Sequence, residues 1–193
     1  MKEIVFLLEE ESAKAMLESL LPRLMSAEIC ARLLAFEGKQ DLEKQMVRKM
    51  KGYINPHARF IVMRDQDATP DCRLVKQPLL EKCELAGRLS VSLVRIACRE
   101  LETFYLADLA AVEAGLGIGG LVDMQQQAKF RCPDELHNPS KVLDTLTRKQ
   151  YHKVSGSRQI GRHLQVDNER SGSFKNLVAG IKKIEHELLQ LAL

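Results

Sequence analysis

The chain has 193 residues and a formal net charge of +3, with 29 Lys and Arg against 26 Asp and Glu. Because 45% of the residues are hydrophobic and 28% are charged, this length fits one domain with a sizeable core and excludes disorder. No apolar run is long enough to cross a bilayer and no secretion signal is recognisable, so we expect a cytoplasmic protein without membrane contact. The five cysteines include no Cys-x-x-Cys pair, which argues against a zinc finger or a disulfide framework.

The first hundred residues alternate short apolar runs with amphipathic segments. Residues 4–8 are nearly all apolar, which is typical of a strand buried on both faces, and residues 12–24 place hydrophobic side chains at helical spacing. The alternation continues with strands expected over 29–36, 60–63 and 91–97, and helices over 40–50, 72–86 and 100–113. We expect Pro78 to kink or divide the helix that contains it. This order predicts an α/β fold whose mostly parallel, four-stranded central sheet is flanked by helices.

The rest of the chain has a less regular pattern. Short helical pieces separated by Gly, Pro and Asn are expected over 115–150, a basic loop over 151–170 and a closing amphipathic helix over 171–191. We therefore expect one compact domain, with an α/β core over residues 1–115 and a helical and loop extension over 116–193. The apolar face of the closing helix would pack on the sheet, and a homodimer contact is the alternative.

Acidic residues follow three of the predicted strands. Glu9 follows the first, Asp65 and Asp67 follow the third, and Glu100 and Glu102 come after the fourth. Ligands of open α/β sheets bind at the carboxyl ends of the strands, where these carboxylates would converge if the strands are neighbours. Asp65 and Asp67 would face the same side of an extended chain, and Mg²⁺ suits such oxygen ligands. The pattern indicates phosphoryl transfer, while turn and helix-capping chemistry without a metal is the alternative.

The segments Leu8-Glu9-Glu10-Glu11-Ser12 and Arg64-Asp65-Gln66-Asp67 each follow an apolar strand. Together they resemble the signature of the Toprim domain, which topoisomerases, DnaG-type primases and OLD-type (overcoming lysogenization defect) nucleases share. Residues 3–24, 36–40, 98–106 and 153–158 also resemble a bacterial family of unknown function. Its members are Toprim-like and are often encoded beside an ATPase of the ABC/OLD type.

The resemblance implies a nuclease that depends on Mg²⁺, with Mn²⁺ as a substitute, and that acts on DNA ahead of RNA. It also implies an ATPase partner and a context in phage defence. Glu9, Asp65 and Asp67 match the catalytic and metal-binding carboxylates of the Toprim signature. Glu102, ahead of Glu100, looks like the additional carboxylate with which OLD-type enzymes bind a second metal.

One position departs from the Toprim pattern, because the Gly that normally follows the first Glu is Glu10 here. Glycine permits close backbone approach, so its replacement puts the geometry of this loop in doubt. The replacement and the modest net charge favour a rival hypothesis, a non-catalytic adaptor or regulatory subunit of the ATPase. A phosphatase-like enzyme on small phosphorylated substrates is a third hypothesis.

Basic residues concentrate between positions 148 and 170, where acidic residues are few. We expect Lys153 to reach the carboxylates as a catalytic and phosphate-binding residue, followed by Arg158 and Arg162 as contacts to nucleic acid. Ser155-Gly156-Ser157 would supply a loop whose backbone can approach a phosphate. A solvated basic surface is the alternative for each of these residues. The Gly115-x-Gly117-x-x-Gly120 pattern follows a predicted helix instead of a strand, so it does not indicate a dinucleotide site.

Overall fold

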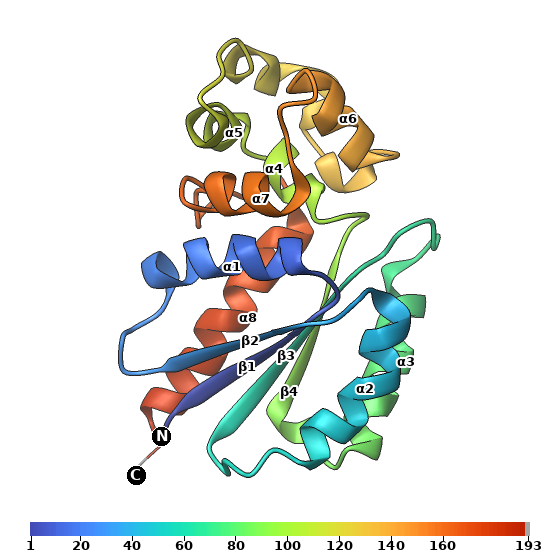
Figure 1. Ribbon diagram of the computed structural model, residues 1–193, viewed down its shortest axis with the longest axis vertical. Coiled ribbons are helices and arrows are strands. Elements are labelled where there is room, and N and C mark those ends of the chain that lie inside the picture. The colour runs from blue at the N-terminus through green and yellow to red at the C-terminus, as the bar shows by residue number, and fades with distance from the viewer. Residues whose placement is uncertain (192–193) are drawn as a thin grey trace.

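Four strands form one parallel sheet in the computed structural model, which describes residues 1–191 (Figure 1). They are β1 (Glu3–Leu8), β2 (Cys30–Ala35), β3 (Ala58–Asp65) and β4 (Ser92–Ala97), in the spatial order β2-β1-β3-β4. All three neighbouring pairs are parallel. All six residues of β1 are buried because this strand lies inside the sheet between two helical layers, which explains its uninterrupted apolar sequence.

Helices cover both faces of the sheet (Figure 1). On one face, α1 (Glu11–Leu24) and α8 (Gly172–Leu189) pack against side chains that include Phe6 and Ile61. On the other face, α2 (Lys39–Lys51) and α3 (Cys72–Leu85) pack against side chains that include Leu7 and Val62. Alternate residues of β1 and β3 therefore enter two separate hydrophobic cores, as the two-residue period of a strand requires.

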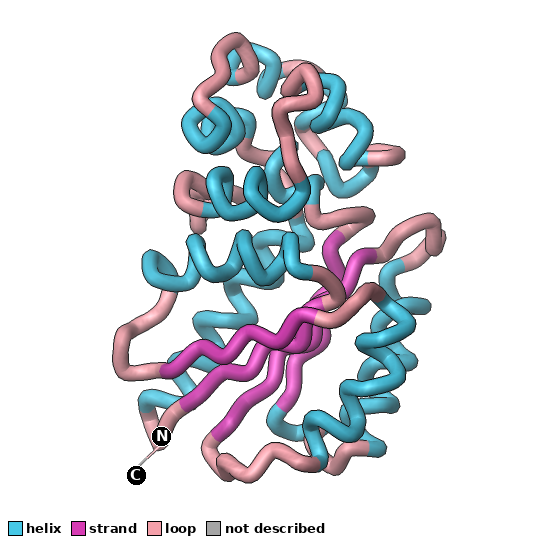
Figure 2. Tube along the Cα trace, in the orientation of Figure 1, coloured by secondary structure: helices cyan, strands magenta, loops and turns pink. Residues whose placement is uncertain are grey.

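The less regular part contains α4 (Glu102–Leu106), α5 (Leu109–Leu116), α6 (Pro139–Leu146) and α7 (Lys153–Gly161). It also contains 3₁₀ turns at Val122–Gln126, Ala128–Phe130 and Pro133–Glu135, and a further turn, Leu89–Val91, precedes β4. Figures 1 and 2 show these helices standing beyond the carboxyl ends of the strands, with α7 beside α1.

The division into a core over 1–115 and an extension over 116–193 stays a prediction. The helix α8 comes from the second part but lies on the sheet with the first part. Residues 192 and 193 of the expected extension lie outside the described residues.

Two details of the expected secondary structure were wrong, and one of the two effects expected of Pro78 is not seen. Residues 151–170 do not form a continuous loop, because α7 buries Gly156, Ser157 and Ile160 in contacts that the local sequence does not reveal. The helix expected over 100–113 is divided into α4 and α5, and the side chain of Asp108 caps α5 by accepting from the Ala111 N–H. Pro78 does not divide α3, whose core-facing residues on both sides of the proline hold it on the sheet.

The apolar face of α8 packs on the sheet, which confirms the first interpretation of the closing helix. Phe174, Leu177 and Ile181 are each 1% exposed or less. No helix within residues 1–191 is long and apolar enough to cross a membrane.

Candidate functional site

The strand order brings three acidic segments to one edge of the sheet. Since β1, β3 and β4 are neighbours, Glu9, Asp65 and the segment that carries Glu102 all lie at their carboxyl ends. Backbone hydrogen bonds fix these segments to one another: the Glu9 N–H donates to the Met63 carbonyl over 3.2 Å, and the Asp67 N–H donates to the Arg99 carbonyl over 2.9 Å. The acidic edge is thus a product of the parallel topology.

Glu9 is buried and lies across the end of β3. Its Oε2 accepts a hydrogen bond from the backbone N–H of Asp65 over 3.1 Å. The Nε of Arg64 lies 3.8 Å from the same oxygen, and Nη1 of Arg64 lies 2.5 Å from Oε1 of Glu43. Burial raises the pKa of Glu9, and the charges of Asp67 and Glu10 raise it further, against the lowering effects of the Asp65 N–H and Arg64.

Asp65 is the most strongly perturbed carboxyl group of this edge. Burial raises the pKa of Asp65 well above its ordinary value, and the charges of Glu102 and Glu9 add to that effect. Neighbouring carboxylates oppose the ionisation of one another. A cation at this edge would therefore reduce the electrostatic repulsion between them.

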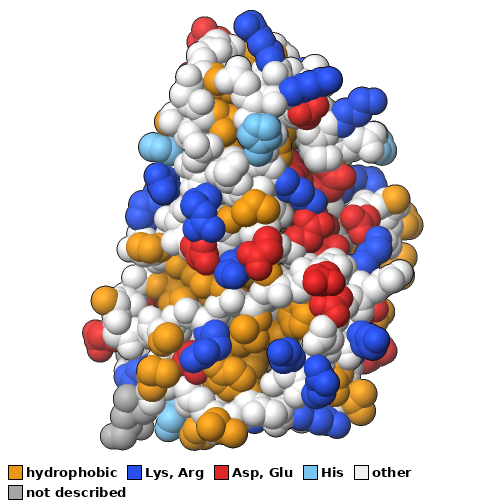
Figure 3. Space-filling model, viewed as in Figure 1, with side chains coloured by type: hydrophobic (Ala, Val, Ile, Leu, Met, Phe, Trp, Pro, Cys, Tyr) orange, Lys and Arg blue, Asp and Glu red, His pale blue; other side chains and the backbone are white. Residues whose placement is uncertain are grey.

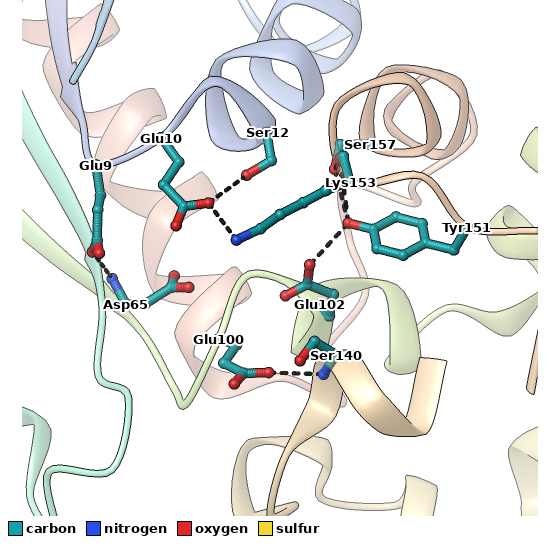
Figure 4. Close-up of polar contacts among 10 residues, drawn as sticks. All are labelled: Glu9, Glu10, Ser12, Asp65, Glu100, Glu102, Ser140, Tyr151, Lys153 and Ser157. Carbon is teal, nitrogen blue, oxygen red and sulfur yellow. Dashed lines mark hydrogen bonds and ion pairs between the residues drawn. The ribbon is translucent and has the colours of Figure 1, made fainter. Parts of the chain in front are cut away.

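Glu102 begins α4 and is 2% exposed. The hydroxyl of Tyr151 donates a hydrogen bond to its Oε1 over 2.9 Å (Figure 4). Burial raises the pKa of Glu102, with Glu100 adding to the effect and with Tyr151 and Lys153 acting in the opposite direction. Burial also raises the pKa of Tyr151, so its phenol keeps the proton that it donates.

Tyr151 is held firmly behind Glu102, and the sequence analysis missed it. Its ring lies edge-on to Tyr105 at a centroid distance of 5.9 Å, and a Cβ on Gly156 would come within 2.6 Å of its Cδ2. Ser157 Oγ lies 3.1 Å from its hydroxyl. A single tyrosine in a segment expected to be a loop carries no sequence signal. Gly156 meets the ring of Tyr151 and Ser157 meets its hydroxyl only because the segment is a helix, and the sequence does not show this.

Lys153 reaches the acidic edge from the first turn of α7. Its Nζ forms an ion pair with Glu10, which also accepts a hydrogen bond from Ser12 Oγ over 3.3 Å. Burial alone would lower the pKa of Lys153, but Glu10, and then Glu102 and Asp65, raise it overall. In Figure 4 the amino group points into the space between Glu10, Asp65 and Glu102.

Glu10 does not disturb the backbone at the position where the Toprim pattern has glycine. Its φ of −143° and ψ of 160° are extended values that any residue adopts. The loop therefore needs no glycine here for its conformation, and the replacement adds a carboxylate that holds Lys153.

Other residues named from the sequence have different surroundings. Asp67 has a φ of 55°, so Asp65 and Asp67 do not share an extended backbone, and Lys39 Nζ lies 2.8 Å from Asp67 Oδ2. Glu100 accepts a hydrogen bond from the Ser140 N–H over 2.7 Å at the start of α6. This capping contact distinguishes it from Glu102.

Arg158 of α7 and Arg162, which follows the helix, lie apart from the carboxylates. Arg158 forms an ion pair with Glu18, which lies eight residues beyond Glu10, or about 12 Å farther along α1. Arg162 is exposed at the carboxyl end of α7. The structure thus brings Lys153 to the acidic edge and leaves these two side chains on the surface beside it.

The donor set of the acidic edge fits a hard divalent cation. Glu9, Asp65 and Glu102 offer only carboxylate oxygens, which is the ligand type that Mg²⁺ prefers. As the side chains of residues 1–191 lie, no three His, Cys, Asp or Glu residues form a group that could hold a metal ion. Mg²⁺ does not require such a cage, since it usually binds one or two carboxylates and keeps several waters.

Comparisons with known proteins agree with this fold. A profile of the family described as "Domain of unknown function (DUF4276)" matches residues 8–182. The chain is also similar in structure to the C-terminal region of the Burkholderia pseudomallei OLD protein, with a TM-score of 0.55 and 15% sequence identity. The match covers 96% of this chain and 98% of that chain. No curated protein matches the chain. The structural likeness shows the fold, and it confirms the predicted Toprim-like α/β architecture.

Proposed function

This chain belongs to the DUF4276 family, and we propose that it is a Mg²⁺-dependent, Toprim-type nuclease that acts on the phosphodiester bonds of nucleic acid. The observation that carries the proposal is the meeting of Glu9, Asp65 and Glu102 at the ends of neighbouring strands, with Lys153 beside them. Burial raises the pKa of all three carboxyl groups and neighbouring carboxylates add to the effect, so a bound cation would favour their charged forms. The OLD-like fold supports the same assignment.

Each residue has a proposed role that follows from its surroundings. Asp65 and Glu9 would hold one metal ion, with Asp67 joining them after releasing Lys39, and Glu102 would hold a second. Bound Mg²⁺, or Mn²⁺ in its place, would neutralise charge on the phosphate oxygens. Tyr151 keeps one carboxylate oxygen of Glu102 in a fixed position. Lys153 would exchange its ion pair with Glu10 for the scissile phosphate.

The substrate and partner follow from the sequence resemblance. We propose DNA as the substrate in preference to RNA. The exposed Arg158 and Arg162 would contact its phosphate backbone. An ATPase of the ABC/OLD type is the proposed partner, phage defence the proposed context and the cytoplasm the proposed compartment.

A second candidate function is a non-catalytic adaptor or regulatory subunit of that ATPase. The observation in its favour is the ion pair between Glu10 and Lys153, because a lysine that is held by a carboxylate is not free to bind phosphate. In an adaptor this ion pair would be permanent, whereas in a nuclease the bound substrate would displace Glu10 from Lys153.

A cleavage assay with matched variants tests the proposal. Supercoiled plasmid and single-stranded DNA are incubated with the wild-type protein, Asp65→Asn or Glu102→Gln, in Mg²⁺ or Mn²⁺. We expect metal-dependent cutting by the wild type and a loss of about 100-fold or more in each variant. Glu100→Gln is the control, since this neighbouring carboxylate caps α6 and should leave the rate within a few-fold.

Two outcomes would contradict the nuclease. Equal cutting by wild type and Asp65→Asn would mean that the activity does not come from this site. No cutting with either metal, alone or with the ATPase added, combined with no rise in thermal stability on Mg²⁺ addition, would leave the adaptor as the better explanation.

A further inference from the structure

The strand β2 is an open edge of the sheet. It pairs with β1 on one side, and no strand within residues 1–191 pairs with its other side. An edge strand presents unpaired backbone N–H and C=O groups, which proteins usually protect with lysines, prolines, bulges or a covering element. The sequence of β2, Cys30-Ala31-Arg32-Leu33-Leu34-Ala35, contains neither Pro nor Lys. The side chain of Arg32 does not guard the edge, because its Nε donates to Glu3 Oε1 over 2.9 Å.

The register of β2 on β1 determines which backbone groups face outward. The N–H groups of Cys30 and Phe36 donate to Lys2 and Leu8, over 3.0 Å and 2.9 Å. Since the N–H and C=O groups of one residue point to the same side of a strand, even-numbered residues bond to β1. The odd-numbered residues Ala31, Leu33 and Ala35 therefore direct their backbone groups away from β1.

Grooves accompany this edge on both faces of the sheet: the groove beside α1 is mostly apolar, and the groove beside α2 is mostly polar. A groove of about 440 Å³ lies below α1, and its lining includes Leu21, Met25 and Leu33. A second groove, of about 450 Å³, lies between β2 and α2, and its lining includes Leu34 and Phe36. Figure 3 shows hydrophobic side chains on either side of the course of β2. No residue of β2 is buried, in contrast to the six buried residues of β1.

We propose that β2 pairs antiparallel with β2 of a second copy of this chain, around a two-fold axis at Leu33. This register makes Leu33 its own partner and places Ala31 opposite Ala35 of the other copy. It uses only residues whose N–H and C=O groups point outward, as hydrogen-bonded pairs of an antiparallel ladder require. The two copies would then share one continuous eight-stranded sheet.

The charges beside the edge are self-complementary about the same axis. Asp41, Gln45 and Lys49 lie four residues apart on α2 and line the groove beside β2. The 13 residues of α2 span about 20 Å, and the six residues of β2 span about the same length. Gln45 and Leu33 lie near the midpoints of these two elements, and both line this groove. The two-fold axis would set Asp41 of each copy against Lys49 of the other, which identifies a second copy as the occupant.

On the opposite face, Glu18 of α1 lines the groove together with Leu33, and it would approach the same residue of the other copy. Its carboxylate already forms an ion pair with Arg158. The rest of that groove is mostly apolar, so pairing would bury Leu33 of both copies between the two α1 helices.

The test measures the mass of the full chain in solution by sedimentation over a concentration series. We expect about twice the chain mass of 21.8 kDa for the wild type. Leu33→Pro removes an outward N–H and should weaken the dimer at least 10-fold, while Leu33→Val should retain it. Lys49→Asp should also weaken the dimer, because it sets Asp against Asp41, and the double change Asp41→Lys/Lys49→Asp should restore it.

Lys51→Asp is the matched control, since it reverses the same charge on the same helix outside the 41–45–49 row. Circular dichroism establishes that each variant is folded. A wild type that stays monomeric at every concentration would overturn the proposal. So would a dimer that neither Leu33→Pro nor Lys49→Asp weakens, and so would a double reversal that dissociates further than Lys49→Asp alone.

Discussion

The hydrogen bond from Tyr151 to Glu102 fixes the position of one carboxylate of the acidic edge. A buried carboxylate needs a hydrogen-bond donor, and the phenol supplies one from a ring fixed by Tyr105 and Gly156. Partners that hold a metal-ligating carboxylate typically contribute about 10–100-fold to metal affinity or activity. Tyr151 is therefore a positioning residue in the proposed site.

We predict that Tyr151→Phe raises the Mg²⁺ concentration needed for half-maximal stabilisation or cleavage by about 10-fold or more. The free energy of unfolding should fall by about 1–3 kcal/mol, because the ring remains but the hydroxyl that contacts Glu102 and Ser157 is lost. Titration of the melting temperature with Mg²⁺ measures both effects. Tyr53→Phe, beside Glu3 at the other end of the sheet, is the control. A loss of stability with an unchanged metal requirement would reduce Tyr151 to a packing role.

At the scale of elements, α7 owes its position to close contacts that only glycine allows. A Cβ at Gly161 would lie 2.7 Å from the Met16 carbonyl oxygen of α1, and a Cβ at Gly115 of α5 would lie 2.7 Å from Ile160 Cα. These atoms belong to the backbone and cannot turn aside. The helix is thus held between α1 and α5, and it delivers Lys153 to the acidic edge.

We predict that Gly161→Ala destabilises the protein by about 1–3 kcal/mol, since it forces α1 and α7 apart. Gly119→Ala is the matched control, because a Cβ there meets no heavy atom within 4 Å and its effect should stay within about 0.5 kcal/mol. Chemical denaturation measures both variants. Equal free energies of unfolding for the two would show that α1 and α7 can separate without cost.

The elements show which parts of the fold the sequence could predict. The apolar run of β1 and the helical spacing of α1 follow from burial within one element, so local periodicity predicts them. Local periodicity does not predict α7, because Gly156 and Gly161 lower its helical propensity. These glycines are needed for close packing against Tyr151 and Met16, which are distant contacts or side chains that the pattern does not reveal. The same reason hides Tyr151.

The prediction that the acidic residues lie close together required only the order of the strands, and no knowledge of individual side-chain contacts. Parallel strands 1, 3 and 4 are neighbours, so the ends that carry Glu9, Asp65 and Glu102 had to meet. The sequence could not predict that Asp67 turns to Lys39 or that Glu100 caps α6. Those contacts depend on a loop with a positive φ and on a helix more than thirty residues away.

For the molecule as a whole, the acidic edge links stability to pH. A carboxyl group whose pKa is raised on folding stabilises the protein fully below its unfolded-state pKa, and that contribution is lost as the pH rises through the folded-state pKa. For Asp65 the loss therefore begins above its ordinary value of 3.8. Glu3 has the opposite sign: burial would raise its pKa, but Asn55 and Arg32 lower it below 4.5 overall.

We predict that Asp65→Asn becomes more stabilising, relative to metal-free wild type, as the pH rises from about 4 to neutrality. Glu3→Gln should become more destabilising over the same range. Denaturation at a series of pH values measures both differences, in which the contributions of groups that do not interact with Asp65 or Glu3 cancel. A pH-independent effect of Asp65→Asn would mean that this carboxyl group is not perturbed, and addition of Mg²⁺ should narrow its difference from the wild type.

The placement of the tyrosines gives the protein an optical probe of its own. The chain contains no tryptophan and three tyrosines, so its near-ultraviolet emission comes from tyrosine alone. Two of the three, Tyr105 and Tyr151, lie in contact with one another, and the phenol of Tyr151 bonds to Glu102. A carboxylate that accepts the proton of an excited phenol quenches its emission. Mg²⁺ bound to Glu102 would make this carboxylate a weaker proton acceptor, so we expect the tyrosine emission to rise as Mg²⁺ binds, and binding at the acidic edge can then be followed without a label.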